Sequence, residues 1–466
     1  MYFNKVSSAH LEQLKSLVGS QNIFVDQVTL QNYSHDETEN LSYLPEVVIK
    51  PENTQQVSVL LKFCNENNIP VTPRGAGTGL SGGSLPVYGG ISLSMEKMNK
   101  IIKLDERNLQ AHVEPGVITE VLMEEAAKLN LLYPVDPSSK GSCFIGGNVA
   151  HGSGGPRVVK YGTLRDYILN LEIVLPNGDV IWTGANTLKY ASGYNLTQLM
   201  IGSEGTLAVI TKIVVKLIPK PQYNLVMLAS FPSAESACEA VSAVFRAGMT
   251  PSALEFMERA GMEWVVKYEG IKFEIKDHVK AYLLVEVDGN NLDLLRSDCE
   301  KIGEVLFGYE CDDILLGESA SEKDELWMMR RKMPLSVKAN SVYKEEDTVV
   351  PRAELPVLLK GIKDIGAKYG FKSVCYGHAG DGNLHVNIIK DSMSEEDWKN
   401  KLPLGIHEIM ELAVKLGGTL SGEHGIGLIQ QPFMNIKFSE VSLQLMRSIK
   451  NVFDPKGILN PGKMIN

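Results

Sequence analysis

Short hydrophobic runs broken by glycine fill residues 45–220 and predict a domain rich in β-strands. Apolar and β-branched residues predominate in each run, over lengths that suit strands rather than helices. The strand candidates are residues 45–51, 91–98, 109–117, 169–182 and 207–220. Residues 54–68 instead carry apolar side chains at helical spacing, and Ser7 or Ser8 is positioned to cap an amphipathic N-terminal helix.

Beyond a proline-rich break at residues 219–223, apolar runs of strand length alternate with longer segments of helical spacing. Strands are expected at residues 225–231 and 280–289. Helices are expected at residues 235–248, 291–306, 353–370, 404–418 and 439–453. This alternation predicts an α+β domain built on an open sheet.

Composition narrows the class of protein. With 466 residues, 44% hydrophobic and 22% charged, the chain is typical of a soluble globular protein with two or three domains. A net charge of −10 argues against nucleic acid as a partner. No run approaches the roughly 18 apolar residues of a membrane segment, and the N-terminus lacks the apolar run of a signal peptide. The six cysteines have no CxxC spacing, which disfavours an iron–sulfur cluster or structural zinc and predicts reduced, buried thiols in the cytoplasm.

Glycine is concentrated in turns at residues 73–83, 146–155 and 202–210, and a fourth turn lies at 134–139. Small residues with unusual φ/ψ can align backbone N–H groups against a phosphate. The first turn lacks the Gly-Lys-Ser/Thr of a P-loop, and its alternating glycines lack the Rossmann spacing. As a set, the turns are suited to backbone contact with a pyrophosphate.

The segment "YGHAGDGNLHVN" predicts a tight hairpin with Asp381-Gly382 at its centre. His378 would then face His385 on one side of the ribbon, with Cβ atoms about 4.5–5.5 Å apart. Two imidazoles so placed can reach one cation. Asn387 would share that face by strand alternation. For the hairpin alone, a pair of hydrogen-bonded surface histidines is an equal alternative.

The segment "SGEHGIG" supplies further candidates. Glu423 and His424 lie among Gly422, Gly425 and Gly427, where the backbone can bend enough to direct neighbouring side chains into one site. In a regular strand the two side chains would face opposite ways, so this interpretation requires a local distortion. Two histidines and a glutamate form a three-ligand set with open positions, as in a catalytic metal site.

Several of these segments together resemble a known family. "PRGAGTGLSGG", "PVDPSSKGSCFIGGNVAHGSGG" and "GSEGTL" are similar to an FAD-binding domain of the vanillyl-alcohol-oxidase type. With "LWMMRRK", "EDTVVPR", "GHAGDGNLHVN", "GEHGIG" and "DPKGILNPGK", the chain from about residue 40 onward resembles the FAD-dependent D-2-hydroxyacid dehydrogenases. These include D-lactate and D-2-hydroxyglutarate dehydrogenases and the flavoprotein subunit of glycolate oxidase.

The resemblance implies an α+β fold class with three parts. These are a vanillyl-alcohol-oxidase-type FAD-binding domain at 1–219, a substrate (cap) domain with an open antiparallel sheet and the metal site at 220–425, and a helical segment at 426–466 that returns to the FAD domain. Thr78 stands where some relatives carry a histidine bonded to the flavin, so FAD is expected to be non-covalent. The FAD-binding residues carried over by motif are Pro73, Arg74, Gly75, Ala76, Gly77, Thr78, Gly79, Ser81, Gly82, Asp136, Pro137, Ser138, Gly141, Gly146, Gly147, Asn148, Gly152, Gly154, Glu204, Gly205 and Ile210.

The resemblance also implies roles at the reacting centre. His378, His385 and Glu423 would bind one divalent metal (Zn²⁺, Fe²⁺ or Mn²⁺), and His424 would be the base. Arg330 would bind the substrate carboxylate, with Lys344 a second candidate offset by one residue in the motif. The other catalytic candidate is Asn387, from the hairpin argument.

The implied activity is oxidation of a small D-2-hydroxy acid to the 2-oxo acid, with hydride transfer to FAD. Pro334, taken as one helical turn beyond Arg330, favours D-lactate or glycolate over a dicarboxylate such as D-2-hydroxyglutarate. Electrons are expected to pass to an electron-transfer flavoprotein or an iron–sulfur subunit. A metal-dependent hydrolase and a non-catalytic flavin-binding subunit are the alternatives.

Overall fold

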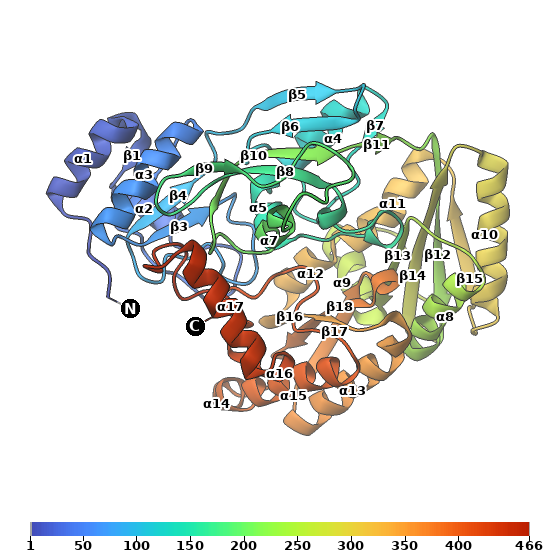
Figure 1. Cartoon of the computed structure of the whole chain (residues 1–466). Helices are drawn as coiled ribbons and strands as arrows, with labels where there is room; N and C mark the ends of the chain where they lie inside the picture. Colours follow the sequence, from blue (N-terminus) through green and yellow to red (C-terminus); the bar gives the residue numbers. More distant parts are fainter. Residues whose placement is uncertain (1, 466) are drawn as a thin grey trace. The chain divides into compact units, whose positions relative to one another are not determined.

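The computed structural model describes residues 2–465, which form two compact units. Unit 1 comprises the described residues up to Gly154, together with Thr163–Lys220 and the described residues from Glu423 onward. Unit 2 comprises Gly155–Gly162 and Pro221–Gly422. Figure 1 labels the helices and strands along the chain.

The first sheet of unit 1 has the order β1-β2-β4-β3, with β2, β4 and β3 parallel and β1 antiparallel to β2. Buried aliphatic side chains of these strands pack against the first and third helices to form its core. Ser7 caps the first helix, as predicted, in a capping box with His10. The elements are α1 Ser8–Val18, η1 Ser20–Asn22, β1 Ile23–Phe24, α2 Gln27–Asn32, β2 Val47–Ile49, α3 Thr54–Asn67, β3 Val71–Arg74 and β4 Ile91–Ser94.

The second sheet of unit 1 is antiparallel, with the order β5-β6-β10-β8-β9. The run at 169–182 is a hairpin, because the turn around Asn177-Gly178 divides it into β8 and β9. The elements are β5 Ile101–Asp105, β6 Gln110–Val113, α4 Thr119–Ala127, β7 Leu131–Leu132, α5 Ile145–His151, η2 Leu164–Asp166, β8 Ile168–Val174, β9 Val180–Trp182, α7 Leu196–Met200, β10 Val209–Lys216 and β11 Ile218–Pro219. β7 and β11 pair as a separate two-stranded sheet.

The last residues of unit 1 return to its first sheet. Leu459 bridges Val71 in parallel, and Ile458 and Leu459 are fully buried in the core of that sheet. The elements of this segment are η5 Gln431–Phe433, α16 Met434–Lys437 and α17 Glu440–Phe453.

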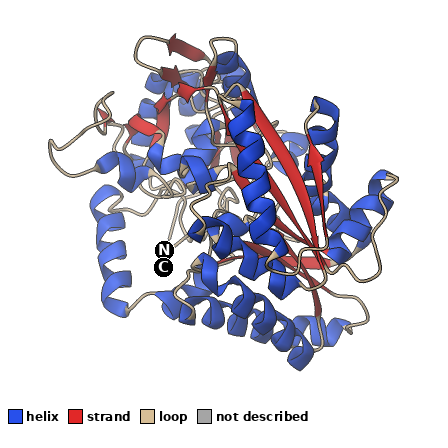
Figure 2. Ribbon diagram, turned by 90° about the vertical axis from the view of Figure 1, so that its right-hand side faces the viewer, coloured by secondary structure: helices blue, strands red, loops and turns tan. Residues whose placement is uncertain are grey.

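Unit 2 is built on one seven-stranded sheet of order β15-β12-β14-β13-β17-β18-β16, in which all neighbouring strands are antiparallel. The open antiparallel sheet expected from the sequence is therefore present. Its long strands form a red layer flanked by helices in Figure 2. The strands are β12 Tyr223–Phe231, β13 Ala253–Glu258, β14 Ala281–Gly289, β15 Asp313–Gly317, β16 Tyr343–Val349, β17 Lys372–Gly377 and β18 Asn383–Ile389.

Helices cover both faces of this sheet. α8, α10, α13 and α15 form a layer on one face, whereas α9, α11 and α12 pack on the other through a core that includes Trp327, Met333 and Tyr376. The elements are α6 Val158–Tyr161, α8 Ala234–Arg246, α9 Arg259–Glu269, α10 Leu292–Phe307, α11 Ala320–Arg331, α12 Met333–Asn340, η3 Arg352–Glu354, α13 Leu355–Tyr369, η4 Ala379–Asp381, α14 Glu395–Asn400 and α15 Leu402–Lys415. Among residues 2–465, no helix combines the length and the apolar character needed to cross a membrane. The six cysteines are free thiols and all are buried, as predicted.

Candidate active site

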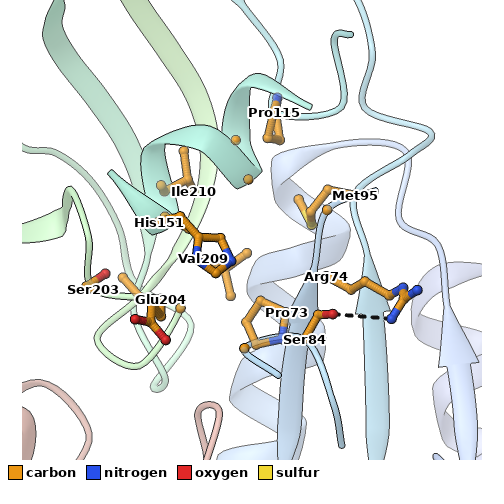
Figure 3. A pocket seen from close by; sticks show the side chains of 17 residues that line it. Pro73, Arg74, Ser84, Met95, Pro115, His151, Ser203, Glu204, Val209 and Ile210 are labelled. Atoms are coloured by element: carbon orange, nitrogen blue, oxygen red, sulfur yellow. Dashed lines mark hydrogen bonds between the residues drawn. The ribbon is translucent and has the colours of Figure 1, made fainter. Parts of the chain in front are cut away.

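A hollow of about 650 Å³, counting its part open to solvent, lies in unit 1 where the glycine-rich turns meet. Figure 3 shows side chains from β3, α5 and the turn before β10 around it. Gly147 leaves open space on this side, because a Cβ added there would meet no atom closer than the Gly75 Cα at 4.0 Å. Backbone from three glycine-rich turns borders the hollow.

The structure sorts the predicted FAD-binding residues into two groups. Those that line the hollow are Pro73, Arg74, Gly75, Gly146, Gly147, Glu204, Gly205 and Ile210. Those not among its lining residues within the described chain are Ala76, Gly77, Thr78, Gly79, Ser81, Gly82, Asp136, Pro137, Ser138, Gly141, Asn148, Gly152 and Gly154. The lining also includes residues that the sequence analysis did not single out for this role, namely Gly83, Ser84, Met95, Pro115, Ala150, His151, Ser203, Ala208 and Val209.

Several glycines outside the lining are explained by contacts with protein atoms. A Cβ at Gly77, where φ is +75°, would lie 2.2 Å from Nη2 of Arg74. A Cβ at Gly427 would lie 2.1 Å from the Ser81 carbonyl oxygen. Close packing of the turns therefore accounts for part of the glycine pattern without any ligand.

Glu204 holds the segment that carries His424. Its carboxylate accepts hydrogen bonds from the backbone N–H groups of Ile426 (2.7 Å) and Gly427 (2.8 Å). The Ser81 carbonyl accepts a further bond from the Leu428 N–H at 2.8 Å. The two bonds to the Glu204 carboxylate are charge-assisted, and such bonds are about twice as strong as neutral ones. This segment is therefore fixed to the glycine-rich turns of unit 1.

Glu423 and His424 lie outside any strand, so the distortion that the sequence analysis required is present. The bend is accommodated at Gly425, where φ is +82°. Gly154 leaves room for the Glu423 side chain, since a Cβ there would lie 2.7 Å from its Oε2.

The predicted two-residue hairpin in unit 2 is wrong in register. His385 pairs with Tyr376 rather than with His378, because the turn is a longer one built on the 3-10 helix η4 at Ala379–Asp381. Gly382 follows with a φ of +78°, and a Cβ there would lie 1.9 Å from the carbonyl oxygen of Val350, the residue after β16. The two imidazoles are neighbours nonetheless, with ring centroids 5.5 Å apart at an angle of 81°. The alternative of a surface pair is excluded, since both histidines are buried.

A buried carboxylate joins His378 to Arg330. Nδ1 of His378 lies 2.8 and 2.9 Å from the two carboxylate oxygens of Glu255, and Arg330 donates from Nε to Oε2 of the same glutamate at 2.8 Å. Burial raises the pKa of Glu255, but His378 and Arg330 outweigh it and the net pKa is lowered. The glutamate is therefore an anion at neutral pH.

Arg330 is a buried cation, and one of its guanidinium nitrogens, Nη2, is available to bind a ligand. The side chain is 4% exposed, and its guanidinium lies over the Tyr376 ring at 5.1 Å from the centroid. Among the described residues, no hydrogen-bond partner reaches its buried Nη2. A buried guanidinium donor without an acceptor is costly, so this atom is suited to an anionic ligand.

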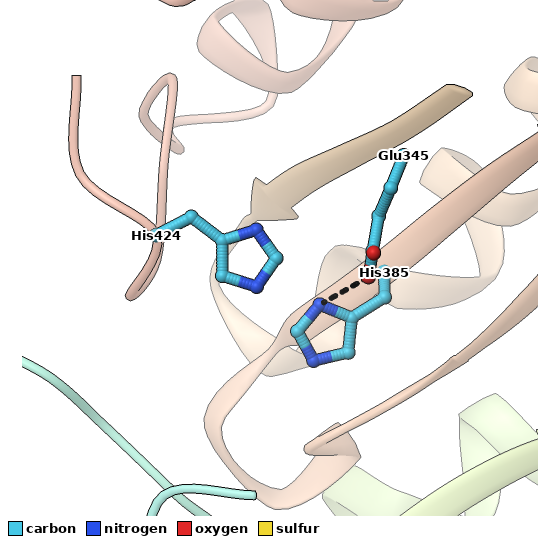
Figure 4. A group of neighbouring side chains, drawn as sticks. All are labelled: Glu345, His385 and His424. Atoms are coloured by element: carbon cyan, nitrogen blue, oxygen red, sulfur yellow. Dashed lines mark ion pairs between the residues drawn. The ribbon is translucent and has the colours of Figure 1, made fainter. Parts of the chain in front are cut away.

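Two further acidic residues surround His385. Its Nδ1 lies 3.7 Å from Oε1 of Glu345, the ion pair drawn in Figure 4, and 3.9 Å from Oδ1 of Asp347. Asp347 also accepts hydrogen bonds from the Ser421 hydroxyl at 2.7 Å and the Gly422 N–H at 2.8 Å. Asp347 therefore ties β16 to the residues that immediately precede Glu423 in the chain.

Strand register places the remaining candidates of unit 2. Asn387 is fully buried and shares a face of β18 with His385, as predicted. Lys344 pairs with Ile388, so it lies on the opposite face of the sheet from His385 and Asn387. Pro334 does not lie one turn beyond Arg330 in a single helix, because α11 ends at Arg331 and Pro334 stands in the first turn of α12.

The sequence analysis missed the acidic residues that support the histidines. Glu255 is an isolated charge in the otherwise apolar stretch "ALEFM", which predicts a buried strand. Glu345 and Asp347 alternate in "YKEEDTVV" and therefore share a face. A charge inside a strand that reads as buried was the available signal, since such a charge requires a partner.

Comparison with known proteins identifies the family. The family model described as "FAD binding domain" matches residues 45–184, and the model described as "FAD linked oxidases, C-terminal domain" matches residues 220–464. The chain belongs to the FAD-linked oxidases. This FAD-linked oxidoreductase is 38% identical to the glycolate oxidase subunit GlcD of Bacillus subtilis (strain 168), over 97% of this chain and 96% of the relative.

Two other relatives extend the comparison. A D-lactate dehydrogenase of Anaerostipes hadrus is 36% identical over 99% of this chain and 98% of its own. A D-2-hydroxyglutarate dehydrogenase of Stutzerimonas stutzeri (strain A1501) is 30% identical over 98% of each chain. The resemblance stated from the motifs is thus confirmed over nearly the whole length.

Solved structures confirm the fold of this FAD-linked oxidase. A substrate-bound p-cresol methylhydroxylase has a TM-score of 0.79 at 21% identity, covering 98% of this chain and 97% of that one. A 4-ethylphenol oxidase from Gulosibacter chungangensis has a TM-score of 0.76 at 19% identity, covering 99% and 98%. At these identities the likeness concerns the fold alone, which is of the vanillyl-alcohol-oxidase type, as predicted.

Proposed function

We propose that this FAD-linked oxidase converts a small D-2-hydroxy acid, with D-lactate or glycolate favoured, into the 2-oxo acid and passes the electrons to a protein partner. The observation that carries the proposal is the buried Arg330–Glu255–His378 network, which offers a guanidinium donor next to a histidine of fixed orientation. The names of two relatives, a glycolate oxidase subunit and a D-lactate dehydrogenase, agree with this substrate class. The more distant hydroxyglutarate relative makes a dicarboxylate the alternative substrate.

FAD is proposed to occupy the hollow of unit 1, held by the turns at Pro73–Gly75, Gly146–Gly147 and Glu204–Gly205. The proposal is supported by the space beside Gly147, by the hollow that these turns line and by the match to an FAD-binding domain. With Thr78 in the first turn, the flavin is expected to be released by acid precipitation of the protein. The match to this domain leaves the metal-dependent hydrolase hypothesis without support.

His378, His385 and Glu423 are the proposed ligands of one divalent cation, Zn²⁺, Fe²⁺ or Mn²⁺. The adjacent imidazoles of unit 2 fit such an ion. Glu423 follows Gly422 directly, and Gly422 is bonded to Asp347, which stands opposite His385 across β16 and β18. Because consecutive Cα atoms are 3.8 Å apart, the chain itself limits how far Glu423 can lie from His385.

Bound FAD supplies the hydride acceptor, and a bound divalent cation supplies a Lewis acid that lowers the pKa of the substrate hydroxyl. Arg330 binds one substrate carboxylate oxygen through Nη2. His424 takes the hydroxyl proton, since a neutral imidazole can act as a general base. Lys344 lies on the opposite face of the sheet from His385, so we do not include it among the residues that bind the substrate carboxylate.

The proposed electron acceptor is an electron-transfer flavoprotein or an iron–sulfur subunit. One relative is named as a subunit, and the buried, dispersed cysteines of this chain are unsuited to a cluster. Reduced thiols also agree with the predicted cytoplasmic location, which stays a prediction. Rapid peroxide formation from substrate and air by this chain alone would argue against a protein acceptor.

The decisive experiment is anaerobic reduction of the purified flavoprotein by a panel of D- and L-2-hydroxy acids, with elemental analysis of the same sample. We expect D-lactate or glycolate to bleach the flavin spectrum fastest, at about one divalent metal per flavin. Reduction by D-2-hydroxyglutarate alone would establish the alternative substrate. No reduction by any member of the panel would refute the proposed activity.

A further inference from the structure

Glu255 is the one buried carboxylate among the described residues that contacts both His378 and Arg330. It lies on the central strand β13 and is fully buried. A buried anion in a central strand is expensive unless charged or hydrogen-bonding partners satisfy it. Both of its partners belong to the proposed reaction, which suggests more than a role in stability.

The contact with His378 decides which nitrogen of that ring carries the proton. An ionised carboxylate only accepts hydrogen bonds, so Nδ1, at 2.8 and 2.9 Å, must be the donor. In the neutral ring Nε2 then carries the lone pair. A histidine that ligates a metal ordinarily has such a partner on its second nitrogen, which fixes the ring and raises its basicity.

The contact with Arg330 decides the direction of the guanidinium. Glu255 takes Nε, and the Tyr376 ring lies against the plane of the group. A planar group held at one edge and one face keeps a fixed orientation, so Nη2 is presented in one direction only.

We propose that Glu255 is a positioning residue that sets both the metal-binding tautomer of His378 and the orientation of Arg330 toward the substrate carboxylate. The inference rests on the proposed function and extends it, because one side chain then couples metal binding to substrate binding. Loss of its charge should weaken both, whereas an ordinary structural glutamate would affect neither selectively.

The test variant is Glu255→Gln, and Glu258→Gln is its matched control. Glu258 is on the same strand, faces the other side of the sheet and is also buried, where it pairs with Lys363 at 2.7 Å and accepts from the Cys375 N–H at 2.6 Å. Both substitutions remove a buried carboxylate that faces a cation. The pair therefore separates a general loss of stability from a specific loss of positioning.

Five quantities are measured on each purified flavoprotein: metal per flavin after dialysis against a weak chelator, KM and kcat for D-lactate, flavin content and melting temperature. For E255Q we expect metal retention to fall at least about tenfold and KM to rise about tenfold, with flavin content unchanged. For E258Q we expect metal retention and KM within twofold of wild type. Equal metal retention and KM in the two variants would overturn the proposal.

A second readout is independent of activity and of metal. In ¹⁵N-histidine spectra of metal-free protein, the signal assigned to His378 through a His378→Gln variant should report an Nδ1–H ring in wild type and in E258Q. That signal should change in E255Q. An Nε2–H ring in wild type would refute the inference, whereas absence of flavin reduction by every 2-hydroxy acid would refute only the proposed function.

Discussion

Glycine-rich turns and mostly apolar or small side chains border the hollow of unit 1, whereas a network of buried charged side chains lies on one sheet face of unit 2. In unit 1 the space itself is the feature: a Cβ at Gly147 would meet no atom closer than 4.0 Å, so a larger side chain there would extend into the hollow. In unit 2 the feature is a set of charges that satisfy one another, with Glu255 between Arg330 and His378. The two regions should therefore fail in different ways: added bulk should damage the first, and removed charge the second.

The largest effect is expected from Arg330→Met. It removes the proposed carboxylate donor and leaves Glu255 with one partner fewer, so kcat/KM for the 2-hydroxy acid should fall about 10²–10³-fold. Steady-state kinetics on the flavin-loaded protein measures this. Arg331→Met is the matched control, because Arg331 is exposed and its guanidinium stacks on Trp327. A similar loss in both variants would show that charge near α11, rather than the buried fork, matters.

The next largest effect is expected from bulk at Gly147. This glycine lies inside α5 without a positive φ, so Ala, Val and Leu are compatible with the backbone. The nearest atom to a new Cβ is 4.0 Å away, and a larger side chain would extend into the hollow. FAD affinity should fall in the order Ala, Val, Leu, reaching about 10–100-fold. Fluorescence titration of apoprotein with FAD measures it, and unchanged affinity in the Leu variant would place the flavin elsewhere.

A smaller effect is expected from Glu204→Gln, which distinguishes two roles for this residue. As a clamp on Ile426 and Gly427, it should cost about 1–3 kcal/mol of unfolding free energy and lower kcat about tenfold, because the segment with His424 loosens. As a nucleotide ligand, it should instead weaken FAD binding with kcat intact. Measuring the FAD dissociation constant and kcat on the same variant decides between them.

The sequence indicated which turns of unit 1 lie close together, but it did not predict the charge network of unit 2, for a physical reason. Turns that need a positive φ or a close backbone approach require glycine, so the glycine pattern of the sequence predicts where they lie. Contacts such as that of Gly427 with Ser81 show that part of this pattern serves packing between turns. A charge network has no such local rule. Glu255 lies 75 residues from Arg330 and 123 from His378, and only the order of strands in the sheet brings them together.

The hairpin shows the same limit at short range. Asp381-Gly382 is a strong two-residue turn signal, yet the observed turn includes a 3-10 helix, and His385 pairs with Tyr376. Gly382 packs against the carbonyl of Val350, which lies 32 residues earlier in the chain, and such a contact favours a turn that no local signal predicts. The histidines remained neighbours because a shift of two residues preserves the face of a strand, whereas a shift of one would have separated them.

The smallest expected effect concerns Lys463, a buried cation of unit 1 that contrasts with Arg330. Its Nζ donates to the Leu85 carbonyl and to Oδ1 of Asn460, which are neutral acceptors. Burial lowers its pKa from 10.5 to about 8, and Glu204 and Asp36 only partly offset this. Above pH 8 the unfolded chain therefore binds more protons than the folded protein, so the free energy of unfolding should rise with pH, by about 1 kcal/mol between pH 8 and 9. Urea unfolding at the two pH values measures this, and Lys463→Met should abolish the increment. If the free energy of unfolding of Lys463→Met rose equally between pH 8 and 9, other groups would be responsible for the pH dependence. Lys463 would then not differ from Arg330 in the way proposed, as a buried cation that loses its proton rather than one paired with an anion.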